Sequence, residues 1–94
     1  METTAADEVA GICRDLLRID TTNTGDPRTT VGERVAAEYV AAQLGEAGLD
    51  VEFHESAAKR ANLVARIPGA DRSRGALLVH GHLDVVPADA SEWS

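Results

Sequence analysis

Residues 76–87 have the sequence Ala-Leu-Leu-Val-His-Gly-His-Leu-Asp-Val-Val-Pro. The stretch begins with four apolar residues in a row, which is typical of a central strand in a sheet covered on both faces. We therefore predict a buried strand over residues 76–83. Because alternate side chains of a strand share a face, His80, His82 and Asp84 are expected on one side of it.

Two imidazoles and a carboxylate at the carboxyl end of a strand suit metal chemistry. A neutral imidazole can bind a metal through one ring nitrogen while a carboxylate holds the other. His82 is therefore the candidate metal ligand, and Asp84 is the candidate catalytic-site carboxylate that orients it. Gly81 permits close approach of another backbone. This spacing predicts half of a zinc site.

Apolar residues at helical spacing predict amphipathic helices over residues 5–18 and 31–47. Thr4 and Thr30 are the expected N-caps, each followed three positions later by an acidic residue, as in a capping box. Gly48 stands where a left-handed helix terminus would need it.

Alternating apolar and polar residues predict two further strands, over residues 49–54 and 63–67. Two helices followed by three strands, the last of them buried, indicate an α/β architecture. We see no internal repeat and no domain linker.

The string His82-Leu83-Asp84-Val85-Val86-Pro87, preceded by Gly81 and an apolar run, closely resembles the first metal motif of a family of co-catalytic zinc hydrolases. That family includes aminoacylase, acetylornithine deacetylase, succinyl-diaminopimelate desuccinylase and carboxypeptidase G. The resemblance implies a three-layer αβα zinc-peptidase-like domain. It also implies that His82 ligates zinc and that Asp84 orients His82, while His80 receives no role.

The same resemblance implies a hydrolase of amide bonds in N-acyl amino acids or small peptides. The complete enzyme would hold two Zn²⁺ ions, for which Co²⁺ or Mn²⁺ could substitute. Its general base and other ligands would follow Ser94 in the sequence. We therefore expect residues 1–94 to be an incomplete, amino-terminal part of the catalytic domain and to be inactive in isolation.

The composition excludes some partners. Nine basic and sixteen acidic residues give a net charge of −7, which argues against binding nucleic acid through its phosphates. No apolar run approaches the length that spans a membrane, and the first residues lack the pattern of a secretory signal. We expect a cytoplasmic protein.

Two other functions fit parts of the pattern. A metallo-β-lactamase-like hydrolase would use both His80 and His82, but its motif needs a further histidine at the position of Val85. A small non-catalytic α/β interaction module would use the histidines only to satisfy backbone groups. Zinc titration distinguishes such a module from a metal enzyme.

Overall fold

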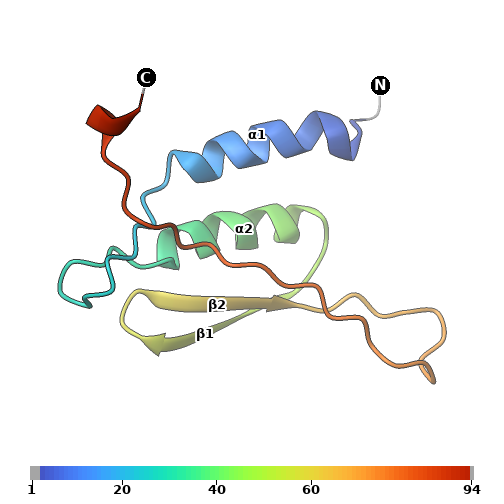
Figure 1. Ribbon diagram of the computed structural model, residues 1–94. Helices are drawn as coiled ribbons and strands as arrows, with labels where there is room; N and C mark the ends of the chain where they lie inside the picture. The colour runs from blue at the N-terminus through green and yellow to red at the C-terminus, as the bar shows by residue number, and fades with distance from the viewer. Residues whose placement is uncertain (1–2, 94) are drawn as a thin grey trace.

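A computed structural model describes residues 3–93 of the 94-residue chain. Two helices are followed by an antiparallel hairpin of two strands and, near the end, by a single 3₁₀ turn at Ala90–Glu92. In Figure 1, α2 lies between α1 and the hairpin, and the chain after β2 makes a wide loop before it returns past the helices. The α/β class predicted from the sequence is confirmed at this level.

Helix α1 spans Ala5–Leu17 and begins as the sequence predicts. The side chain of Thr4 accepts a hydrogen bond from the Asp7 backbone N–H, and the Asp7 carboxylate accepts one from the Thr4 backbone N–H, which completes the capping box. Arg18 is the C-cap, so the predicted end is one residue too late. No helix in the described part of the chain is both long and apolar enough to cross a bilayer.

Helix α2 spans Arg34–Glu46, and the predicted start at residue 31 is wrong. Gly32 has a φ of +91°, a left-handed conformation that cannot continue into a right-handed helix. Glu33 occupies the N-cap without a side-chain capping bond. The hydroxyl of Thr30, the expected cap, instead donates to the carbonyl oxygen of Asp26 at 2.9 Å. At the other end Ala47 is the C-cap, so the predicted end is again one residue too late, while Gly48 follows with a φ of +87°, as predicted.

The hairpin consists of β1 (Val51–Ala57) and β2 (Arg60–Ala65). Both predicted strands exist, but their bounds are shifted because the connecting turn is only two residues long, Ala58 and Lys59. Lys59 adopts a φ of +67° there. Turn positions with positive φ usually carry Gly, Asn or Asp, so the sequence gives no signal for this turn.

The third predicted strand, over residues 76–83, is wrong for the described structure. None of its residues is assigned to a strand, and Leu77, Leu78 and Val79 are 88%, 81% and 84% exposed. A central strand needs hydrogen-bonding neighbours on its edges, and the sheet within residues 3–93 has only β1 and β2. The three-layer αβα arrangement is likewise not formed.

The interior of the described chain is small. Its buried apolar residues are Ala36 and Ala37 of α2 and Ala61 of β2, where the helix packs on the hairpin. Alanine methyl groups contribute little hydrophobic stabilisation compared with larger side chains. The radius of gyration, 16.0 Å, exceeds the about 12 Å expected of a compact domain of this length.

We expect the 94-residue chain, expressed by itself, to be marginally stable and to aggregate. The reason is the small core together with the exposed apolar residues Leu77, Leu78 and Val79. Thermal unfolding followed by circular dichroism, combined with light scattering, measures both properties. A sharp cooperative transition of a monomer would contradict this expectation.

Candidate functional site

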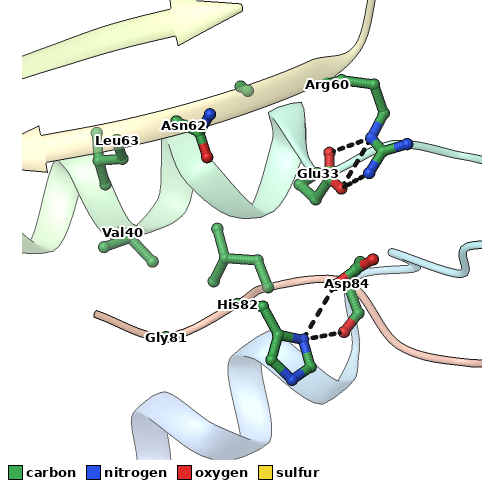
Figure 2. A pocket seen from close by; sticks show the side chains of 10 residues that line it. Glu33, Val40, Arg60, Asn62, Leu63, Gly81, His82 and Asp84 are labelled. Atoms are coloured by element: carbon green, nitrogen blue, oxygen red, sulfur yellow. Dashed lines mark hydrogen bonds and ion pairs between the residues drawn. The ribbon is translucent and has the colours of Figure 1, made fainter. Parts of the chain in front are cut away.

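Residues 81–84 form one wall of a cleft of about 380 Å³. The opposite wall comes from α2 and β2, which contribute Val40 and residues 60–63, and Glu33 closes one end. Figure 2 shows His82 and Asp84 on the extended segment, with the His82 ring on the side away from Arg60 and Glu33. The cleft therefore combines the sequence-predicted pair with an ion pair that the sequence did not indicate.

His82 and Asp84 contact each other as predicted. The Nδ1 atom of His82 lies 2.8 Å from the Asp84 backbone oxygen and 3.0 Å from its carboxylate Oδ1. Both oxygens are acceptors when Asp84 is ionised, so Nδ1 must carry the proton. The side chain of His82 is 84% exposed. The lone pair of Nε2 is thus left available to a metal ion from solvent.

The carboxylate of Asp84 has one hydrogen-bonding partner on each oxygen. Its Oδ2 accepts a hydrogen bond of 2.8 Å from the Asn23 side-chain amide, and its Oδ1 faces His82. The bond from Asn23, then that from His82, and finally the charge of Arg60 lower the pKa of Asp84 below its usual value. Asp84 is therefore ionised at neutral pH, as an orienting carboxylate requires.

Glu33 and Arg60 form the ion pair at the end of the cleft. The Arg60 Nε lies 2.9 Å and 2.8 Å from the two carboxylate oxygens of Glu33, and a terminal guanidinium nitrogen lies 2.8 Å from Oε1. The Glu33 side chain is only 10% exposed, whereas that of Arg60 is 40% exposed, so the pair is shielded from solvent mainly on the Glu33 side. The pair also holds the Arg60 guanidinium on Glu33, beside but not on Asp84.

A second, mostly apolar hollow of about 350 Å³ lies on the other side of the motif. It lies between the apolar face of α1, including Ile12 and Leu16, and the residues His82, Leu83 and Val85. His82 borders both hollows. Its ring therefore stands at the junction of a polar and an apolar surface.

The other histidines lie apart from the cleft. His80 is exposed and does not line it. His54 is exposed on β1 and contacts Glu52, as expected of a solvated histidine. Within residues 3–93, no three His, Cys, Asp or Glu side chains are grouped closely enough to hold a metal ion. His82 is consequently a single candidate ligand and not a complete site.

Sequence reasoning missed Asn23, Glu33 and Arg60. Asn23 lies in a polar loop whose composition indicates only local turns, and its partner is 61 positions away. Glu33 was interpreted as part of a capping box, and Arg60 falls between the two predicted strands. An acidic residue and a basic residue in separate elements give no pairing signal in a single sequence.

Comparison with known proteins gives two matches of the same kind. The chain is 29% identical over 83 residues to the acetylornithine deacetylases of Vibrio atlanticus (strain LGP32) and Vibrio vulnificus (strain CMCP6). The match covers 88% of this chain but 21% of each relative, so the chain spans about a fifth of their length. No family model and no solved structure matches the chain. The similarity is distant and points to a deacylase or related hydrolase.

Proposed function

We propose that this chain supplies a metal-ligating histidine and its orienting carboxylate to a zinc-dependent hydrolase. The bonds cleaved are amides of N-acyl amino acids or small peptides. The observation that carries the proposal is the contact between His82 Nδ1 and Asp84, which leaves Nε2 free on an exposed ring. The distant similarity to acetylornithine deacetylases supports the choice of an acylated amino acid as substrate.

The donor atoms present fit Zn²⁺, which binds imidazole nitrogen and tolerates Co²⁺ or Mn²⁺ as replacements in sites of this kind. When bound, zinc polarises the amide carbonyl and makes water a stronger nucleophile. Asp84 keeps the proton of His82 on Nδ1 and holds the ring in place. Residues 3–93 hold no group of three possible ligands, and the chain spans about a fifth of the matched relatives, so the proposal places the remaining ligands and the general base outside these residues.

Two rival functions are weaker. A metallo-β-lactamase-like site would need both His80 and His82 and a histidine where Val85 stands. A non-catalytic module would use the histidines only to satisfy backbone groups. His82 Nδ1 does contact the Asp84 backbone oxygen, but it also lies 3.0 Å from the Asp84 carboxylate, a contact that such a module does not require. We further propose a cytoplasmic location and no nucleic-acid partner, consistent with the net charge of −7.

The natural protein at its full length tests the proposal. We expect it to hydrolyse N-acetyl amino acids, with N-acetylornithine in the panel, and to lose that activity on treatment with a chelator. Added Zn²⁺, Co²⁺ or Mn²⁺ should restore it. Release of the free amino acid, followed by amine detection, is the measurement. A stringently purified protein that ignores the chelator, or that binds no zinc, would exclude a zinc hydrolase.

A further inference from the structure

Residues 21–23, in the loop that follows α1, are hydrogen-bonded to residues 83–85, which include Asp84. The Thr21 hydroxyl donates to the Leu83 carbonyl at 2.8 Å, and the Asn23 backbone N–H donates to the Val85 carbonyl at 2.8 Å. The Val85 N–H in turn donates to the Thr21 carbonyl at 3.2 Å, so residues 21–23 and 83–85 form a short parallel pairing. Thr21 is only 4% exposed. The backbone on both sides of Asp84 is therefore fixed by this loop.

The side chain of Asn23 has a defined orientation within this pairing. Its Oδ1 accepts a hydrogen bond of 2.9 Å from the Gly25 backbone N–H, which can only be a donor. The Nδ2 group must therefore point the other way, toward Asp84 Oδ2 at 2.8 Å. The terminal torsion of an aspartate is soft, so a carboxylate bonded on one oxygen alone can turn. With Asn23 on one oxygen and His82 on the other, it cannot.

We propose that Asn23 is a positioning residue, which acts on the metal ligand His82 by fixing the orientation of the Asp84 carboxylate. This inference rests on the proposed function, because it assigns His82 to the metal. Without the Asn23 amide, the carboxylate is held by His82 on one oxygen alone, and its terminal torsion is free to turn. The ring then keeps the Asp84 backbone oxygen as a partner but loses its charged one.

Exchanging the side chains of Asn23 and Asp84 tests whether the contact from Asn23 to Asp84 acts on His82. In Asp84→Asn, the new amide can offer its oxygen to His82 or to Asn23, but not to both. If the oxygen faces His82, two NH₂ groups oppose each other. If it faces Asn23, the NH₂ group faces Nδ1 and favours the tautomer that protonates Nε2. In Asn23→Asp, two carboxylates oppose each other. The double variant pairs the new carboxylate with the new amide and leaves the amide oxygen for His82.

The experiment measures the zinc dissociation constant of the full-length protein by competition with a chromophoric chelator, together with kcat and KM. We expect each single substitution to weaken zinc binding by about 10- to 100-fold, the range typical of outer-sphere partners. If the two substitutions acted independently, the double variant would lose zinc affinity by the product of the two single factors. Because the two residues are in contact, we expect the double variant to bind zinc at least about tenfold more tightly than that product predicts. Strictly additive losses would overturn the inference.

Asn23→Ser separates positioning from a purely local role. Serine can still accept a hydrogen bond from the Gly25 N–H but cannot reach Asp84. Thermal unfolding should then be nearly unchanged while zinc binding and kcat fall by a few-fold to about tenfold. If zinc affinity in Asn23→Ser and Asn23→Asp equals that of the natural protein, Asn23 only shapes its loop. Failure of the proposed function itself looks different, because the natural protein would then bind no zinc at all.

Discussion

Replacing His82 by Ala should abolish the zinc-dependent hydrolysis proposed for the full-length protein. The substitution removes the one imidazole whose Nδ1 is held by Asp84 and whose Nε2 faces solvent. A metal bound by few protein ligands cannot lose one of them without a large fall in affinity. We expect at least one zinc ion per molecule to be lost at micromolar free zinc, and kcat to fall to background.

His80→Ala is the matched control for this prediction. His80 is two residues away in the same extended segment, is exposed and does not line the cleft. It should therefore keep its full zinc content and turnover. Metal content by atomic emission and hydrolysis of N-acetyl amino acids are the two measurements. Equal zinc content in His82→Ala and the natural protein would show that the ligand is misassigned, and a loss confined to His80→Ala would favour a His80-dependent site.

Gly32→Ala is expected to lower the free energy of unfolding more than Gly25→Ala does. Gly32 has a φ of +91°, and a Cβ built on it would lie 2.7 Å from Lys59 Cβ and closer still to the Lys59 carbonyl oxygen. The left-handed conformation alone costs an alanine about 1–2 kcal/mol. The collision of the new Cβ with the Lys59 backbone adds to this cost. The Lys59 carbonyl cannot move away freely, because it accepts a hydrogen bond of 3.1 Å from the Arg34 N–H. We expect a total loss of about 3 kcal/mol or more.

Gly25→Ala isolates the conformational part of this effect. Gly25 has a similar φ of +83°, but no atom lies within 4 Å of the Cβ that alanine would add. Its loss should stay near 1–2 kcal/mol. Thermal or urea unfolding of both variants in the full-length protein measures the difference. Equal destabilisation by the two substitutions would mean that contact between Gly32 and the hairpin turn contributes nothing.

Much of the local structure follows from the sequence because its causes are local. The Thr4 and Asp7 capping box and the helix terminus at Gly48 depend on residues within a few positions of each other. The pairing of His82 with Asp84 is also local, since the two residues are two positions apart. These features were predictable in type, and mostly in position.

The errors have a physical cause in contacts between distant residues. The start of α2 was wrong because Gly32, packed against Lys59, is left-handed, and because the Glu33 side chain pairs with Arg60, 27 positions away, instead of completing a capping box. The third strand was wrong because hydrophobicity predicts burial only where a neighbouring strand or helix is present to cover the chain. The role of Asn23 was invisible because its partner Asp84 is brought to it by the fold and not by the sequence.

The Lys59 carbonyl couples the local unfolding of the hairpin turn to that of the start of α2. It accepts the Arg34 N–H, one of the first amides of α2, which has no partner within its own helix. When the hairpin frays at its turn, this amide loses its acceptor, so the helix start and the turn exchange their protons with solvent together. Helix α2 and the hairpin, which also pack on each other, thus form one cooperative unit of local unfolding. Helix α1 packs less extensively on the rest of residues 3–93: the Tyr39 hydroxyl of α2 donates to its Asp15 carboxylate at 2.7 Å, but α1 has no packing comparable to that between α2 and the hairpin, and we expect it to open without them.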